Sequence, residues 1–171
     1  MNAAMQAPEL QVSAWLSTIE PLSLAALRGK VVAVYAFQML CPGCVSHGIP
    51  QAKQIRETFS ADDVAVLGLH TVFEHHDVMN KAALEAFLHE YRVQFPVAID
   101  QPSRTGPIPL TMQAYQLRGT PSLLLIDREG RLRQSHFGRA GDMAVGAEIG
   151  HLIAEPAPSS AACTDDACAI R

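Results

Sequence analysis

The stretch Val31-Val32-Ala33-Val34-Tyr35-Ala36-Phe37 is followed three residues later by Cys41-Pro42-Gly43-Cys44. The first stretch is apolar throughout, as expected for a strand buried on both faces of a parallel sheet. Pro42 suits the first position of a following helix, where its missing N–H is not needed, so Cys41 becomes the N-cap. A cysteine there faces unpaired N–H groups and the positive end of the helix dipole, which favour the thiolate. The sequence therefore predicts a dithiol redox site in which Cys41 is the nucleophile and Cys44 is the resolving thiol.

Other uses of the cysteines stay open. A C-x-x-C pair also occurs in zinc sites, which need four ligands, usually from a second Cys or His pair at short spacing. The two remaining cysteines, Cys163 and Cys168, lie five residues apart near the C-terminus and would have to fold back to complete such a site. This tail pair is a candidate second dithiol that relays electrons, a metal-capture segment, or a pair of idle thiols. Asp165 and Asp166 between them would raise the pKa of a neighbouring thiol, which argues against a strong nucleophile.

Several histidines are candidates for proton transfer or metal binding. His47 follows Cys44 by about one helical turn and could exchange a proton with it, although an exposed helix histidine fits the sequence as well. His70, His75 and His76 do not form a convincing metal site, because adjacent histidines project in different directions and no cysteine lies near them in the sequence. We therefore expect no bound metal and no cofactor.

Composition sets the limits of the protein class. The chain has 171 residues, of which 49% are hydrophobic, and a formal net charge of −4. This length fits one domain with a full core, and neither nucleic acid nor an anionic membrane surface is expected as a partner. The first ten residues lack the features of a signal peptide, so we expect a cytoplasmic protein, in which a disulfide is more often catalytic than structural.

The pattern along the chain predicts strands and helices in alternation. Apolar strands are expected at 31–37, 64–70 and 95–99, a β-hairpin at 122–137, and helices after Cys44, after Asn80 and from Asp142 onward. Pro50 should kink the first helix, since an interior proline costs about 3 kcal/mol. The order β-α-β-α-β, hairpin, α predicts an α/β sheet that is parallel in its first part and antiparallel at one edge. We assign residues 1–19 to an N-terminal extension, 20–154 to the domain and 155–171 to a flexible tail.

This order, with C-x-x-C at the first strand-to-helix junction, resembles the thioredoxin superfamily and within it the TlpA-like and redoxin branch. The motifs that carry the resemblance are Leu27-Arg28-Gly29-Lys30, Cys41-Pro42-Gly43-Cys44, Phe95-Pro96-Val97, Gly119-Thr120-Pro121 and Leu125-Ile126-Asp127. The resemblance implies a three-layer α/β/α sandwich with a mixed central sheet. It also implies a thiol–disulfide oxidoreductase that acts on protein or small-molecule thiols and draws on an electron donor that the sequence does not identify. Thr120-Pro121 should be a cis peptide beside the dithiol, with the Thr120 backbone available to a substrate.

The sequence departs from the thioredoxin pattern at four positions. Leu40 stands where thioredoxins usually have tryptophan, and the dipeptide Pro42-Gly43 is the reverse of theirs. Tyr35 replaces a buried aspartate, and His47 takes the place of an acidic residue that is frequent in TlpA-like proteins.

Two other functional classes remain as alternatives. A thiol peroxidase of the peroxiredoxin type usually has Pro-x-x-x-Thr/Ser-x-x-Cys, but Val34 and Gln38 occupy those positions here. A non-enzymatic redox-sensing or metal-handling module would use the thiols of both cysteine pairs.

Overall fold

The computed structural model describes residues 5–156, in which six strands form one sheet. The strands are β1 (Val12–Leu16), β2 (Val31–Phe37), β3 (Val64–His70), β4 (Val97–Asp100), β5 (Ser122–Ile126) and β6 (Leu132–Phe137). The α-helices are α1 (Ile49–Thr58), α2 (Lys81–Glu90), α3 (Leu110–Ala114) and α4 (Asp142–Ala154). A 3₁₀ turn, η1 (Ala25–Leu27), precedes β2, and a π-helical turn, η2 (Cys44–Gly48), precedes α1. Among the described residues, no helix is long and apolar enough to span a membrane.

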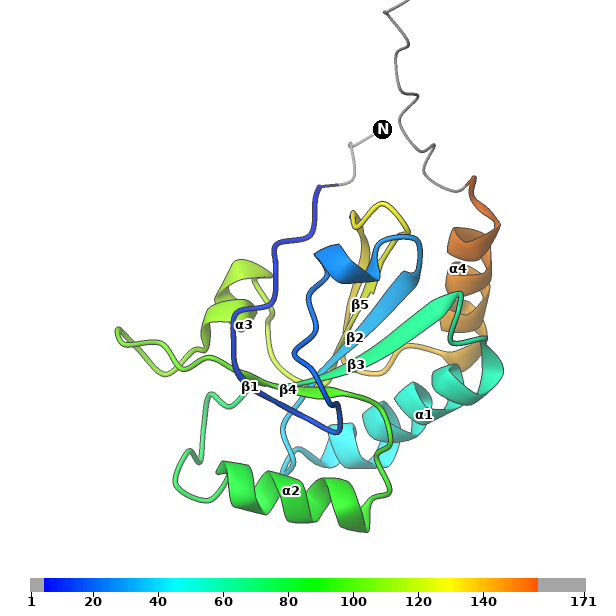
Figure 1. Cartoon of the computed structure of the whole chain (residues 1–171). Coiled ribbons are helices and arrows are strands. Elements are labelled where there is room, and N and C mark those ends of the chain that lie inside the picture. Colours follow the sequence, from blue (N-terminus) through cyan, green and yellow to red (C-terminus); the bar gives the residue numbers. More distant parts are fainter. Residues whose placement is uncertain (1–4, 157–171) are drawn as a thin grey trace, which may run out of the picture.

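The sheet is mixed, with the strand order β1-β4-β3-β2-β5-β6 (Figure 1). Strands β2, β3 and β4 run parallel, whereas β1, β5 and β6 each pair antiparallel with their neighbours. All seven residues of β2 are buried, because this strand lies between β3 and β5 and is covered on both faces. The loop that carries Cys41 therefore leaves the sheet from one of its most constrained strands.

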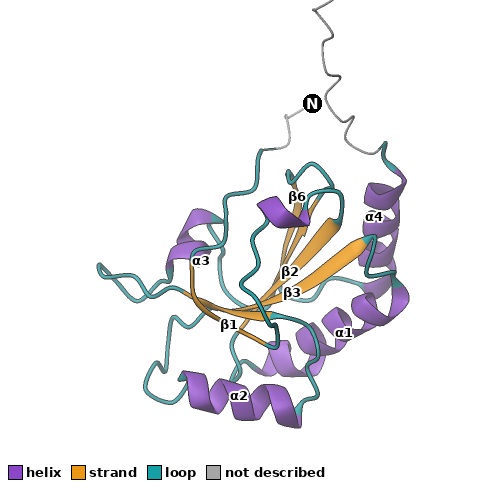
Figure 2. Ribbon diagram, in the orientation of Figure 1, coloured by secondary structure: helices purple, strands orange, loops and turns teal. Residues whose placement is uncertain are grey.

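Helices cover both faces of the sheet, with α1 and α4 on one side and α3 on the other (Figure 2). Alternate side chains of β2, from Val31 to Phe37, pack with apolar residues of α1, α2 and α4. The intervening side chains, from Val32 to Ala36, pack with Leu24 and Tyr115 on the opposite face. This arrangement is the predicted α/β/α sandwich.

The predicted domain boundary at residue 20 is too late. Strand β1 pairs with β4 along the register Val12↔Asp100 to Leu16↔Val97 and so forms one edge of the sheet. The short helix α3, at Leu110–Ala114, was also not predicted from the sequence. The Asp100 carboxylate stabilises this short helix by accepting hydrogen bonds from the Thr111 and Met112 N–H groups, at 2.8 and 3.0 Å.

The helical segment after Cys44 begins as a π-helical turn ahead of Pro50 and continues directly into α1. The Ile49 N–H donates to the Cys44 carbonyl, five residues earlier, and Pro50 becomes the second residue of α1. A π-helical turn of this kind is frequent at functional sites. Here it places Gly48 directly against the Tyr35 ring, where a side-chain Cβ would lie 2.5 Å from the nearest ring carbon.

Candidate dithiol active site

Cys41 caps the start of the helical segment, as the sequence predicts. Residues 42–43 are already helical, and the Cys44 N–H donates to the Cys41 sulfur at 3.3 Å. The Cys41 thiol lies 3.5 Å from the carbonyl oxygen of Thr120, to which it can donate. Its side chain is partly exposed, so a substrate can reach the sulfur. A thiolate at this place would keep the hydrogen bond from the Cys44 N–H, which helps to stabilise its charge.

Cys44 is fully buried, with 0% of its surface exposed. Burial raises the pKa of its thiol to about 12, and the neighbouring Cys41 adds to this increase. Both cysteines are free thiols in the structure. The pair thus combines an accessible sulfur with a protected one.

The Thr120–Pro121 peptide bond is cis, as the family resemblance implies. Pro121 is buried against the cysteine motif, since a Cβ on Gly43 would meet the Pro121 ring at 3.3 Å. Together with the hydrogen bond to the Thr120 carbonyl, this contact places the Gly119-Thr120-Pro121 loop beside Cys41.

Cys41 lies in a groove of about 380 Å³ between three loops that are distant in the sequence. The groove is lined by residues of the cysteine loop, of the segment after β3, of the loop before β5 and of the end of β6: Gln38, Leu40, Cys41, Pro42, Phe73, Glu74, His75, Val78, Met79, Gly119, Thr120 and Phe137. Three of the lining side chains are large, hydrophobic and more than half exposed: Leu40, Val78 and Phe137. Sequence patterns did not locate this surface, because most of its lining residues lie outside the Cys41-Pro42-Gly43-Cys44 and Gly119-Thr120-Pro121 motifs.

Buried polar groups fix the loop that leads from β2 to Cys41. The Gln38 amide donates to the Glu74 carboxylate at 3.2 Å and accepts from the Phe73 N–H at 3.3 Å. His70, only 1% exposed, accepts the Met39 N–H at its Nε2 atom, at 3.4 Å. These contacts join the cysteine loop to the segment that follows β3.

A second pocket, of about 190 Å³, is lined by residues of η2 and α1 that follow Cys44. Tyr35, His47, Gln51 and Asp142 are among its lining residues. Burial, together with the charges of Cys44, Asp142 and Cys41, raises the pKa of Tyr35 well above its usual range, so the phenol is neutral. His47 is exposed, and its Nδ1 atom lies 2.7 Å from the Ser46 carbonyl. The structure therefore places His47 at the rim of this pocket, whereas Cys44 is buried, and the proton-transfer role of His47 stays a prediction.

The described residues contain no group of three or more His, Cys, Asp and Glu side chains that could hold a metal ion. The tail cysteines Cys163 and Cys168 lie outside the described residues.

Comparison with known proteins identifies the family. Residues 3–135 match the model of the AhpC/TSA family. The chain belongs to this family. No curated protein shows significant similarity to it.

Solved structures support the same assignment for this AhpC/TSA-family protein. The thioredoxin-like superfamily protein SPOA0173 is 60% identical with a TM-score of 0.89, and the match covers 91% of this chain and 100% of that one. A thiol-disulfide isomerase from Corynebacterium glutamicum is 49% identical with a TM-score of 0.86, over 91% of this chain and 100% of that one. A thioredoxin-like protein solved in its oxidized form shares the fold, at 20% identity and a TM-score of 0.74, over 91% and 99% of the two chains.

The difference in burial predicts a large difference in alkylation rate. At pH 8, a thiol with a pKa of about 12 is ionised in about one molecule in ten thousand, and Cys44 is also shielded from the reagent. Iodoacetamide should therefore label Cys41 at least about a hundredfold faster than Cys44. Mass spectrometry of peptides from a time course would measure both rates. Equal or faster labelling of Cys44 would contradict the assignment of Cys41 as the accessible nucleophile.

His70 should make the stability of the protein fall in mild acid. Burial lowers its pKa to about 4 in the folded state, whereas an unfolded histidine has a pKa of about 6.5. Between these values the unfolded chain binds a proton that the folded protein does not, so stability decreases as the pH falls, by about 2.5 kcal/mol at pH 4.5.

Urea unfolding at pH 7 and pH 4.5 would test this expectation. His70→Gln should reduce the difference between the two free energies of unfolding, whereas His89→Gln, at an exposed position in α2, should leave it unchanged. If His70→Gln and the wild-type protein showed the same difference in free energy of unfolding between pH 7 and pH 4.5, His70 would not be the cause of the loss of stability in acid.

Proposed function

We propose that the protein is a thiol–disulfide oxidoreductase that works through a mixed disulfide at Cys41. The observation that carries this proposal is the position of the Cys41 sulfur. It is partly exposed, receives the Cys44 N–H and lies at the edge of the apolar groove. Homology with a thiol-disulfide isomerase at 49% identity supports the same class of reaction.

The proposed reaction has two exchange steps. The Cys41 thiolate attacks one sulfur of a substrate disulfide, and the other substrate sulfur leaves as a thiolate that takes a proton from solvent. Cys44 then loses its proton and attacks the Cys41 sulfur, which releases the second substrate thiol and leaves a Cys41–Cys44 disulfide. Two electrons pass from the protein to the substrate, and a thiol donor must return them before the next turnover. The steps are reversible, so the same site can oxidise a dithiol when the donor and acceptor are exchanged.

The groove favours a peptide or protein substrate with apolar side chains near its cysteine. Leu40, Val78 and Phe137, from three separate segments of the groove lining, offer exposed apolar surface. The backbone of Thr120, beside the sulfur, can contact an extended chain in the manner of an added strand. These two features support the proposal that Thr120 and Pro121, together with the three apolar residues, bind the substrate.

Peroxide reduction receives less support from the geometry. In the peroxiredoxin-type motif, the residue three places before the reactive cysteine is Thr or Ser, but here it is Gln38. The Gln38 side-chain amide donates a hydrogen bond to Glu74 and accepts one from the Phe73 N–H. Val34 is fully buried in the sheet. The loop therefore presents no side-chain hydroxyl toward Cys41 from this position.

Two assays on the same preparation test the proposal. With dithiothreitol as the donor, the protein should accelerate the reduction of insulin disulfides, and it should consume hydrogen peroxide no faster than its Cys41→Ser variant does. Rapid peroxide consumption that needs Cys41 alone, without insulin reduction, would favour the peroxidase instead.

A further inference from the structure

We propose that the tail segment Cys163-Thr164-Asp165-Asp166-Ala167-Cys168 docks beside Cys41 and exchanges disulfides with it within one chain. The inference rests on the proposed function, since it assigns a partner to the same reactive sulfur. Its basis is a positively charged surface next to the groove, the acidic sequence between the two tail cysteines, and the length of chain that links them.

The surface in question, called here the arginine strip, consists of Arg118, Phe137 and Arg139. Phe137 borders the Cys41 groove on one side, and on the other it borders a pocket of about 350 Å³ that both arginines line. The Arg118 guanidinium lies 5.3 Å from the centroid of the Phe137 ring. The strip is therefore continuous with the groove that contains the reactive sulfur.

The charges of the strip are unpaired within residues 5–156. Neither Arg118 nor Arg139 forms a salt bridge there, although both are exposed. The nearby His136 already pairs with Glu148 at 2.7 Å. These two guanidinium groups, in the pocket that adjoins the Cys41 groove at Phe137, would attract the carboxylates of Asp165 and Asp166, and arginine is well suited to bind such groups.

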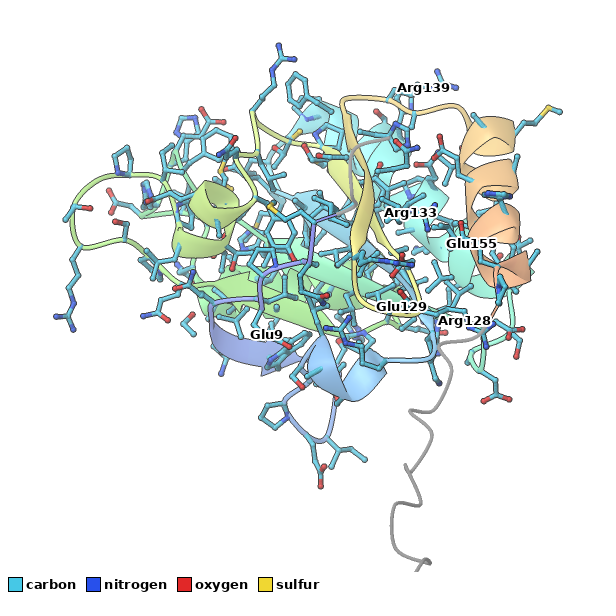
Figure 3. All side chains as sticks on the ribbon, turned by 90° about the horizontal axis from the view of Figure 1, so that it is seen from above. Glu9, Arg128, Glu129, Arg133, Arg139 and Glu155 are labelled. Carbon is cyan, nitrogen blue, oxygen red and sulfur yellow. The ribbon has the colours of Figure 1, made fainter. Side chains whose placement is uncertain are left out.

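The chain is long enough to bring the tail back to this strip. In Figure 3, Arg139 lies ahead of α4 and Glu155 lies beyond its end. The 13 residues of α4 span about 20 Å at 1.5 Å per residue. From Pro156, an extended chain reaches about 24 Å to Cys163 and about 40 Å to Cys168, at roughly 3.4 Å per residue. Cys168 thus reaches the start of α4 and beyond with chain to spare, and we assign it as the preferred partner of Cys41.

The exchange is balanced without any further reagent. A Cys168 thiolate attacks the Cys41 sulfur of the Cys41–Cys44 disulfide, and Cys44 leaves as a thiolate that takes up a proton. Cys163 then attacks Cys168 in the mixed disulfide, which forms the Cys163–Cys168 disulfide and releases Cys41. Two electrons move from the tail to the dithiol of the helix, and the reverse sequence moves them back.

The test uses the full chain with only two cysteines left. In Cys44→Ser/Cys163→Ser, Cys41 and Cys168 should form an intramolecular disulfide in a glutathione buffer. Peptide mapping of the monomer identifies the disulfide. The dependence of disulfide formation on the glutathione concentrations gives the effective concentration of the Cys168 thiol at Cys41. A flexible tether alone gives values in the millimolar range, and docking should raise them by at least about tenfold. The corresponding variant Cys44→Ser/Cys168→Ser keeps Cys163 instead. It should form less of the Cys41–Cys163 disulfide than the first variant forms of the Cys41–Cys168 disulfide.

Charge variants separate docking from tethering. Adding Arg118→Gln and Arg139→Gln, or 0.5 M NaCl, should remove the tenfold gain, because exposed charges are screened at that salt concentration. Adding Arg104→Gln, in the loop before α3, should leave the effective concentration unchanged. An effective concentration that responds neither to the two arginines nor to salt would overturn the inference, and so would a disulfide found only between two chains. Insulin reduction by the wild-type protein tests the proposed function separately, so an active enzyme without the monomeric bond would refute the tail inference alone.

Discussion

Replacing Cys41 with serine should lower the rate of insulin reduction by at least about a thousandfold. A serine hydroxyl stays protonated at neutral pH and cannot form the mixed disulfide on which both exchange steps depend. The rate would be measured from the turbidity of the released insulin B chain, with dithiothreitol as the donor. Because Cys41 lies at the surface and its sulfur makes only two hydrogen bonds, the variant should fold normally.

Cys44→Ser, combined with Cys163→Ser and Cys168→Ser so that no tail thiol can resolve the mixed disulfide, is the matched control for this experiment. It should also stop turnover, but it should keep the first step, so that one equivalent of substrate becomes bound through Cys41. Cys41→Ser should bind none there. A Cys41→Ser variant that retains more than a tenth of the wild-type rate would show that another thiol starts the reaction.

Gly48→Ala should destabilise the fold by about 2–3 kcal/mol, because overpacking in a dense core has costs of this size. The new methyl group would lie 2.5 Å from a ring carbon of Tyr35, a residue that is only 2% exposed and belongs to the central strand β2. Neither the ring nor the backbone of the π-helical turn can move away without disturbing the helix that carries Cys44. Thermal unfolding should show a melting temperature lower by about 5–10 °C.

Gly146→Ala provides the comparison, since a Cβ at Gly146 in α4 would have no heavy atom within 4 Å. This substitution should be neutral or stabilise the protein by up to about 1 kcal/mol. Combining Gly48→Ala with Tyr35→Val should cost less than the sum of the two single changes, because the smaller side chain relieves the contact. Equal stability of Gly48→Ala and wild-type protein would mean that the close approach is not a constraint.

The parts of the fold that were predicted from the sequence have local causes. The uniform burial of residues 31–37 and the cap at Cys41 follow from neighbouring residues alone. The cis bond before Pro121 was implied by the family resemblance, in which the Gly119-Thr120-Pro121 motif accompanies the cysteine pair. The side chain of Asn80 also caps α2 as predicted, by accepting the Ala83 N–H at 3.1 Å.

The parts that were missed depend on contacts between distant residues. Strand β1 includes the polar Ser13 and is held by its pairing with β4, more than 80 residues away in the sequence. Helix α3 has five residues and owes its cap to Asp100, which belongs to a preceding strand. The groove and the arginine strip likewise join loops that no short motif connects, so only the folded chain brings them to Cys41.

The most direct test of the account is to identify the sulfur that bonds to substrate. Protein that carries Cys44→Ser, Cys163→Ser and Cys168→Ser, so that no second thiol can displace the substrate, would be incubated with a peptide disulfide, quenched in acid and digested without reduction. Mass spectrometry then locates the mixed disulfide. We expect the peptide on Cys41, at close to one equivalent per chain, and loss of that adduct when Cys41→Ser is added. A stoichiometric adduct on another residue, with Cys41 still a free thiol, would contradict the central claim.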